Sequence, residues 1–270
     1  MARNPSALPA YLTRLFSLAG KKAVITGGSS GIGKEIALAL GQSGATVILI
    51  ARRAQPLAAA VEQLGQLGVP ATSITADLSN LADLHHASAR VRSAHGVPDI
   101  LVNAAGASRR PPLSRMTQGD WDHTIAANLT APFALGQAFG PGMAERGSGR
   151  IINIVGQQQS PRALGGGGGG GGAHGAARGG LVSLTRSQAE AWSRSGVLCN
   201  AIAPGLVETP ATEKLLADDA DGAEAHAART MIGRNGMVED FAGVAVWLAS
   251  GASAAVTGQT IFVDGGYSAT

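Results

Sequence analysis

The amino-acid sequence predicts one doubly wound α/β domain, with helices on both faces of a parallel sheet. Short runs rich in Ile, Val and Leu alternate with longer segments that carry Ala and Leu at helical spacing. A glycine-rich turn separates the first apolar run from the first helical segment. No linker long enough to divide the chain interrupts this alternation, which is typical of a parallel sheet.

Each predicted strand is an apolar run bounded by turn residues. The predicted strands are Lys22–Thr26, Thr46–Ile50, Ile100–Asn103, Arg150–Val155, Leu198–Ala203 and Gln259–Val263. The predicted helices are Gly33–Ser43, Pro56–Leu67, Asn80–Ala94, Thr117–Met143, Leu181–Ser195 and Asp240–Ala249. We expect the domain to span residues 18–270, after an N-terminal arm over residues 1–17 that lies on the surface or against a partner subunit.

Composition excludes several functional classes. The 270 residues are 45% hydrophobic and 14% charged, with a formal net charge of +3 and only 4% aromatic residues. The isoelectric point is near 9.4, but no basic stripe of the kind that nucleic-acid binding requires is present. The chain has no apolar run long enough to span a membrane, no secretory signal pattern and one cysteine, Cys199, so we expect a cytoplasmic protein.

One segment is of low complexity: the eight consecutive glycines from Gly165 to Gly172. Ordering a glycine costs more backbone entropy than ordering any other residue, so a mobile surface loop is expected unless something holds the segment. An engineered insertion is the alternative.

The turn from Thr26 to Gly33 predicts a dinucleotide site. Its glycines let the backbone approach a pyrophosphate, and the following helix offers free N–H groups and a partial positive charge. The motif stands at the strand-to-helix junction that this function requires. The predicted cofactor contacts in this turn are Gly27, Ser29, Ser30, Gly31, Ile32 and Gly33.

The end of the second strand indicates which dinucleotide is bound. An acidic side chain there would bind the ribose hydroxyls of NAD, but Ala51 has no such group. Arg52 and Arg53 can pair with the 2′-phosphate of NADP, which predicts NADP(H). The alternative is a solvated charge pair at the start of a helix.

Later motifs are Asn103–Gly106, Asn200–Gly205, Val256–Gln259 and Val263–Gly266. Together with the glycine-rich turn, they resemble the short-chain dehydrogenase/reductase family, near the gluconate 5-dehydrogenase-like oxidoreductases, from about Leu18 to the C-terminus. The resemblance implies a Rossmann fold and an oligomer, a dimer or a tetramer. It implies further cofactor contacts at Asp77, Leu78, Asn103, Ala104, Gly106, Pro204, Gly205, Val207 and Thr209. It also implies a helper role in catalysis for Asn128 and a substrate lid over residues 206–230.

The family's catalytic serine, tyrosine and lysine are replaced in this chain. Counting back from Leu181–Arg186 places His174 at the tyrosine position and Arg178 at the lysine position. Strand register places Gly156 at the serine position, and the alternative register places Gln157 there. Ser160, Gln157 or Gln158 could supply the missing donor if the loop folds inward. No histidine spacing indicates a metal site, and His85, His86, His95, His123 and His226 are expected to be solvated.

The replacements have chemical consequences. Glycine offers no side-chain donor to a developing oxyanion, and the loss of one donor costs about 10²–10³ in rate. His174 can still act as a general acid, since an unperturbed imidazole has a pKa near 6.5. Arg178 keeps a positive charge but cannot give up a proton, and it favours the neutral form of His174. The alternative for His174 is a position at the start of a helix with no chemical role.

Two functional hypotheses remain. In the first, the chain is an NADP-dependent oxidoreductase of a small carbonyl or alcohol, in which His174 is the proton donor, Asn128 holds a water and Arg178 lies at the ribose. In the second, it is a redox-silent relative that binds NADP(H) without turnover, or an enzyme of a redox-neutral step such as cyclisation or isomerisation.

Overall fold

A computed structural model describes residues 10–106, 111, 113–156 and 172–269 of the chain. In this part of the chain, seven parallel strands form one sheet in the order β3-β2-β1-β4-β5-β6-β7. The strands are β1 (Lys22–Thr26), β2 (Thr46–Ala51), β3 (Ala71–Thr75), β4 (Ile100–Asn103), β5 (Gly149–Ile154), β6 (Val197–Pro204) and β7 (Thr260–Val263). The predicted doubly wound α/β fold is confirmed.

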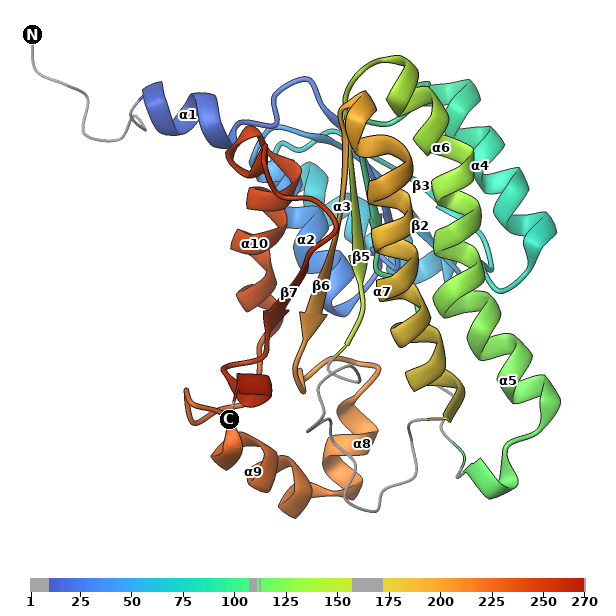
Figure 1. The fold of residues 1–270 in the computed structure, drawn as a ribbon, viewed down its shortest axis with the longest axis vertical. Coiled ribbons are helices and arrows are strands. Elements are labelled where there is room, and N and C mark those ends of the chain that lie inside the picture. Colours follow the sequence, from blue (N-terminus) through green and yellow to red (C-terminus); the bar gives the residue numbers. More distant parts are fainter. Residues whose placement is uncertain (1–9, 107–110, 112, 157–171, 270) are drawn as a thin grey trace, which may run out of the picture.

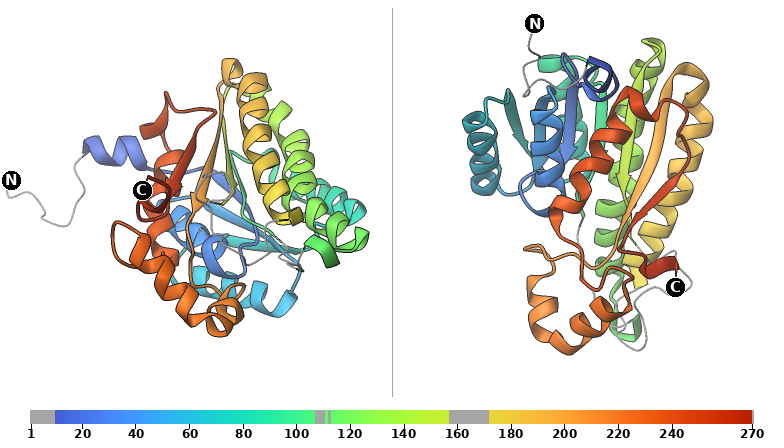
Figure 2. Two further views of the ribbon diagram at one scale, coloured as in Figure 1. Left: turned by 60° about the horizontal axis from the view of Figure 1, so that its bottom comes forward. Right: turned by 90° about the vertical axis from the view of Figure 1, so that its left-hand side faces the viewer.

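Helices cover both faces of the sheet (Figures 1 and 2). One face carries α2 (Gly31–Gln42), α3 (Ala54–Gln66) and α10 (Ala242–Ala249), whose apolar residues share one core with β1 and β2. The other face carries α4 (Leu81–His95), α6 (Ala131–Glu145) and α7 (Gly172–Trp192), which enclose a second core around Phe139 and Met143. Two cores on opposite faces explain why the central strands are almost continuously apolar.

The structure adds one strand that the sequence analysis missed. Strand β3 is at the edge of the sheet, where Ala71 pairs with Val47 of β2, and only Ile74 of its five residues is buried. An edge strand with one buried side chain lacks the apolar run by which the other strands were predicted. The other strands agree with prediction to within about one residue at each end.

The predicted helix Thr117–Met143 is helical without a break from Gln118 to Glu145, but its hydrogen-bond pattern changes along its length. Thr117 caps α5 (Gln118–Ile125), a five-residue π-helix follows at Ala126–Thr130, and α6 then begins. Pro132 has no N–H to donate to the carbonyl four residues earlier, so the regular hydrogen-bond ladder is interrupted beside Asn128.

Two other helix boundaries also differ from prediction. Helix α7 begins at Gly172 rather than at Leu181, and Ser193–Ser195 form a 3-10 turn after it. Glycines in the first turns weaken the local signal, while burial of Ala173 and Ala177 stabilises the helix there. Helix α10 begins at Ala242, after a 3-10 turn at Val238–Phe241.

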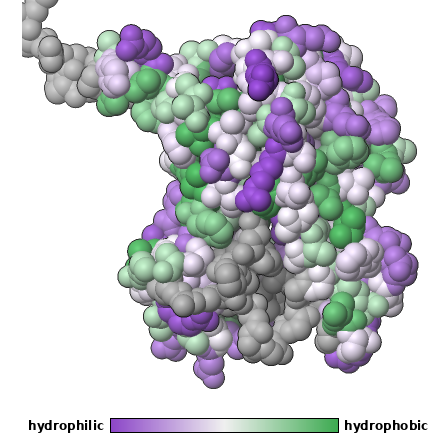
Figure 3. Space-filling view, viewed as in Figure 1, coloured by the Kyte–Doolittle hydropathy of each residue, from purple (hydrophilic) through white to green (hydrophobic). Residues whose placement is uncertain are grey.

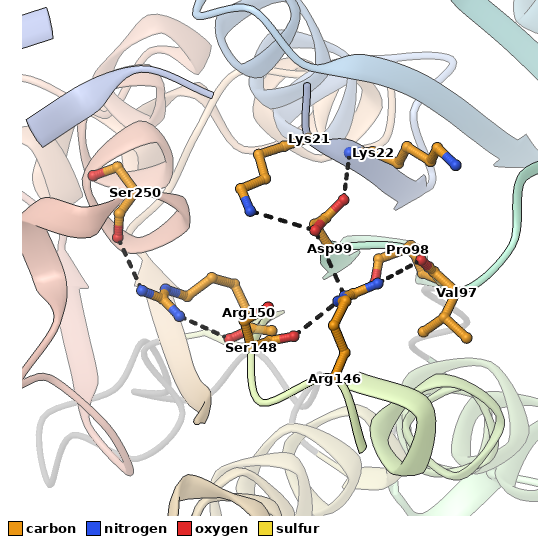
Figure 4. A network of polar contacts seen from close by, with 10 residues as sticks. Lys21, Lys22, Val97, Pro98, Asp99, Arg146, Ser148, Arg150 and Ser250 are labelled. Carbon is orange, nitrogen blue, oxygen red and sulfur yellow. Dashed lines mark hydrogen bonds and ion pairs between the residues drawn. The ribbon is translucent and has the colours of Figure 1, made fainter. Parts of the chain in front are cut away.

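Polar contacts fix the amino ends of the central strands, opposite the edge that carries the candidate site (Figure 4). Asp99 accepts a hydrogen bond from the backbone N–H of Lys22 at 2.9 Å and forms ion pairs with Lys21 and Arg146. Arg150 donates to the carbonyl of Ser250, just after α10, and burial lowers the pKa of its guanidinium. These contacts join β1, β4, β5 and α10, and so hold the strands whose far ends carry the site.

The N-terminal arm contains the short helix α1 (Ala10–Phe16), none of whose residues is buried. Helix α1 lies at the margin of the domain (Figure 1) and contacts the 3-10 turn at Gly251–Ser253. Figure 3 shows hydrophilic residues scattered over one face, with apolar residues in small patches between them. The predicted oligomer, and the alternative that the arm packs on a partner subunit, remain predictions.

Candidate active site

The candidate site is a cavity of about 500 Å³ at the carboxyl ends of the strands. The strand order reverses between β1 and β4, and ligands of open α/β sheets bind at such a switch point. The cavity is lined by residues from the glycine-rich turn, the ends of β2 to β6, helices α5 and α7 and the segment after β6. One cavity therefore joins the predicted cofactor residues to the predicted catalytic ones.

The glycine-rich turn owes its shape to close backbone packing. A Cβ atom at Gly33 would lie 2.6 Å from the carbonyl oxygen of Gly27, and one at Gly27 would lie 2.9 Å from the backbone of Ala105. Gly27 and Gly31 also have positive φ angles of 69° and 55°, which L side chains rarely adopt. This leaves an open cradle at the N-terminus of α2, which fits the pyrophosphate of a dinucleotide.

Arg52 and Arg53 line the cavity at the end of β2. The side chain of Arg52 is 64% exposed, and its Nη1 lies 4.0 Å from Oδ2 of Asp77. Burial alone would raise the pKa of Asp77, but hydrogen bonds from Ser79, with Arg52 and His123 nearby, hold it below its usual value. Asp77 is therefore an ionised acceptor next to the guanidinium of Arg52 at this end of the cavity.

His123 is a site residue that the sequence analysis missed. It was expected to be solvated, but on α5 it lies one helical turn before Ala127, and both residues line the cavity. Residues of one helix four positions apart share a face, which is why His123 and Ala127 line the cavity together. Other cavity residues outside the prediction are Ala51, Ala76, Ser79, Ala105, Ile154, Val155, Leu206, Pro210, Ala211 and Thr212.

The predicted catalytic residues Gly156, His174 and Arg178 line one end of the cavity, here named the catalytic end. Gly156 follows β5 and is buried, while His174 and Arg178 are 9% and 7% exposed on one face of α7. The guanidinium of Arg178 donates from Nη1 to the carbonyl of Ile154 at the end of β5. The alternative residue Gln157, and the candidate donors Gln158 and Ser160, lie outside the described residues, as does most of the glycine run.

Two predicted site residues lie behind the cavity wall. Asn103 is buried and donates to Asn153 Oδ1 at 2.8 Å, which ties β4 to β5. Asn128 is also buried, and its Nδ2 donates to the carbonyl of Thr124. A Cβ at Gly106 would lie within 3 Å of both Asn128 Oδ1 and Arg178 Nη2, so only a glycine leaves room for them. Neither asparagine lines the cavity directly.

The segment after β6 comprises a loop, helix α8 (Glu213–Asp218) and helix α9 (Ala220–Arg229). Its first part faces the site, since Leu206, Val207 and Thr209–Thr212 line the cavity. Its last part turns away, and His226 there is 3% exposed, which makes the expectation of a solvated residue wrong. His85 and His86 are exposed, as expected.

The described ranges hold neither a candidate membrane span nor a candidate metal site. No helix in this part of the chain combines the length and apolar character needed to cross a bilayer. The described residues also contain no group of His, Cys, Asp or Glu side chains arranged to hold a metal ion. Burial raises the pKa of the Cys199 thiol to about 12, so this cysteine is not a nucleophile at neutral pH.

Comparisons with known proteins extend over nearly the whole chain. Residues 27–268 match the family model described as enoyl-(acyl carrier protein) reductase. Gluconate 5-dehydrogenase of Gluconobacter oxydans (strain 621H) is 37% identical over 252 residues, which are 93% of this chain and 96% of that protein. 5-Keto-D-gluconate 5-reductase of Escherichia coli (strain K12) is also 37% identical over 252 residues, 93% and 97% of the two chains.

Solved structures agree with the sequence relatives. A gluconate 5-dehydrogenase from Burkholderia cenocepacia J2315, in complex with NADP and tartrate, has a TM-score of 0.88 and 34% identity, covering 96% of this chain and 99% of that one. A 3-oxoacyl (acyl-carrier-protein) reductase from Agrobacterium tumefaciens C58 with NADP bound has a TM-score of 0.87 and 33% identity, covering 95% and 97%.

Proposed function

Because this chain belongs to the short-chain dehydrogenase/reductase family, an NAD(P)-dependent oxidoreductase family, we propose that it is an NADP(H)-dependent oxidoreductase of a small carbonyl or alcohol. The observation that carries this proposal is the single cavity that joins the glycine-rich turn, the two arginines after β2 and the His174–Arg178 face of α7. The gluconate-type relatives make a polyhydroxylated ketone or its alcohol the first substrate to test.

The residues present fit the proposed cofactor. The backbone of Ser29–Gly33 would hold the pyrophosphate at the N-terminus of α2, and Arg52 and Arg53 would pair with the 2′-phosphate. Asp77 and Leu78 would contact the adenine, while Pro204, Gly205, Val207 and Thr209 would line the nicotinamide end. The NADP bound in structural neighbours supports this assignment.

The bound nicotinamide would supply or accept the hydride at the carbonyl carbon. We assign the proton transfer at the carbonyl oxygen to the imidazole of His174, which is buried at the cavity wall. Arg178 would place a fixed positive charge next to the ribose and the developing oxyanion. Gly156 supplies no side-chain donor, so we expect turnover about 10²–10³ slower than with a donor at this position.

The buried Gly156 also favours a second candidate function, a relative that binds NADP(H) without redox turnover or performs a redox-neutral step such as cyclisation or isomerisation. Binding and chemistry use different residues in this cavity, so loss of the chemistry leaves the binding residues unchanged.

Two measurements on the native chain distinguish these functions: NADPH binding by fluorescence titration, and NADPH oxidation with 5-ketogluconate and a simple ketone. We expect binding and slow turnover that His174→Ala abolishes. His85→Ala, which changes an exposed histidine of α4, is the matched control and should retain full activity.

A triple variant, Gly156→Ser/His174→Tyr/Arg178→Lys, restores the residues that the family resemblance implies. If the native chain binds NADPH without any turnover and the triple variant gains it, the oxidoreductase proposal fails and the redox-silent one stands. If His174→Ala keeps the native rate, the role given to His174 is wrong.

A further inference from the structure

The segment from Leu206 to Thr230, here named the lid, touches two parts of the molecule. Its first residues line the cavity, whereas the far side of α9 packs on the C-terminal segment that follows β7. Figure 1 shows α9 next to the C-terminal turn, below the carboxyl ends of the strands. Contacts made at α9 can therefore act on the cavity through the lid.

Tyr267 in the C-terminal segment is held by two side chains of α9. The ring of His226 stacks on the ring of Tyr267, with centroids 4.3 Å apart and planes 15° apart. The Arg229 guanidinium carbon lies 4.4 Å from the centroid of the same ring. Because the imidazole covers one face of the phenol, the guanidinium must occupy the other, and Tyr267 is fully buried between them.

The surroundings of His226 fix the neutral form of its ring. Asn235 donates from Nδ2 to the carbonyl of Ala223, which turns its Oδ1 towards His226 Nδ1, 2.7 Å away. The proton therefore lies on Nδ1, and the buried Nε2 has no hydrogen-bond partner among the described residues. Burial is the main cause of a lowered His226 pKa, with Arg229 lowering it further while Asn235 and Asp264 oppose the shift.

The chain on which Tyr267 sits is itself fixed. Gly265 and Gly266 have positive φ angles of 65° and 83°, and a Cβ at either would approach Ile232 or Met231 to 2.7 Å. The carboxylate of Asp264 accepts hydrogen bonds from the backbone N–H groups of Gly266 and Ser268 at 3.0 Å. Tyr267 is therefore anchored independently of the lid, and the chain leaving the lid packs against the same turn.

We propose that Tyr267, enclosed by His226 and Arg229, is a positioning residue that sets how the lid lies over the cavity. None of the three side chains lines the cavity, so each acts only through α9. The importance of the lid for cofactor and substrate rests on the proposed function, but the position of α9 can be measured without either.

Hydrogen exchange of the backbone amides of α8 and α9 tests the proposal directly in the full chain without cofactor. We expect Tyr267→Leu to raise exchange in these helices about threefold to tenfold, in line with the loss of one aromatic pair and one cation–π contact. Exchange in the central strands β1, β4 and β5 should stay unchanged. Tyr267→Phe keeps the stacked ring and should raise exchange less than Tyr267→Leu does.

Tyr11→Leu is the matched control, because Tyr11 is the other tyrosine of the chain and is 62% exposed on α1. The three side chains His226, Arg229 and Tyr267 are here named the clamp. If Tyr267→Leu does not fold, Arg229→Met tests the clamp at an exposed residue and should raise exchange in α8 and α9 by less. Arg229→Lys keeps the positive charge and should exchange like the native chain. Unchanged exchange in α8 and α9, or a rise that extends equally to the central strands, would overturn the proposal.

NADPH titration of the same variants separates this inference from the proposed function. Faster exchange in the lid together with weaker NADPH binding supports both. Faster exchange without any NADPH binding by the native chain leaves the clamp standing and removes the proposed function. Native-like exchange with tight NADPH binding removes the clamp alone.

Discussion

The glycine-rich turn after β1 and the catalytic end formed by β5 and α7 share one cavity, but they are built in different ways. The turn works through backbone groups, and contacts under 3 Å around Gly27 and Gly33 exclude any side chain there. The proposed catalytic end would work through side chains, and there Gly156 follows β5 while His174 and Arg178 lie on α7. A binding site formed by backbone groups depends on the fold itself. A reaction carried out by side chains can be lost or altered by substitutions that leave the fold unchanged.

Gly33→Ala is the strongest test of this difference. The added Cβ would meet the Gly27 carbonyl oxygen at 2.6 Å, and such overpacking costs about 1–3 kcal/mol. The clash distorts the glycine-rich turn that would hold the pyrophosphate. We therefore expect NADPH affinity, measured by fluorescence titration, to fall about 10- to 100-fold. The matched control is Gly179→Ala in α7, where the new Cβ meets nothing within 4 Å and should stabilise the chain by about 0.5–1 kcal/mol. Native NADPH affinity in Gly33→Ala would contradict the comparison.

Replacing both Arg52 and Arg53 with Gln should have the next largest effect. A hydrogen bond to a charged group contributes about 1.5–3 kcal/mol. Arg52 is exposed, so solvent screening lowers its contribution. We therefore expect the double variant to bind NADPH about tenfold more weakly, which corresponds to about 1.4 kcal/mol. NADH affinity should not change, because NADH lacks the 2′-phosphate. Parallel titrations with both cofactors measure the ratio, and an equal loss for the two would remove these arginines from the phosphate site.

The smallest expected effect is a change in the free energy of unfolding with pH, which would come from His226 in the lid. The His226 pKa is lowered in the folded chain from its ordinary value of 6.5, so below about pH 6.5 the unfolded chain binds more protons. Stability is therefore full above this pH and falls as the pH decreases, by less than about 1.4 kcal/mol per unit for one group. Urea unfolding at pH 7.5 and 5.5 measures this loss.

His226→Phe keeps a stacked ring but cannot take up a proton, so its loss of stability between the two pH values should be smaller than in the native chain. An identical loss in both chains would show that other groups carry the acid sensitivity.

The sequence alone determined the fold class, the turn from Thr26 to Gly33 and the positions of Gly156, His174 and Arg178, because each depends on local pattern or on spacing along one element. The tertiary structure decided what depends on distant contacts. It added β3, whose single buried residue gives no apolar run, and it introduced a π-helical stretch within the predicted helix Thr117–Met143, just before Pro132.

The lid shows most clearly where local pattern fails. His226 lies on a polar, Ala-rich helix and was expected to be solvated, but it is buried against Tyr267, 41 positions further along the chain. Likewise, His123 lies at the cavity and Asn103 and Asn128 lie behind its wall, because helix packing and the sheet decide which side chains face the space between them. The sequence by itself determined the segments with a strong local pattern, and the tertiary structure decided the edge strand and which side chains meet, because both depend on contacts between distant residues.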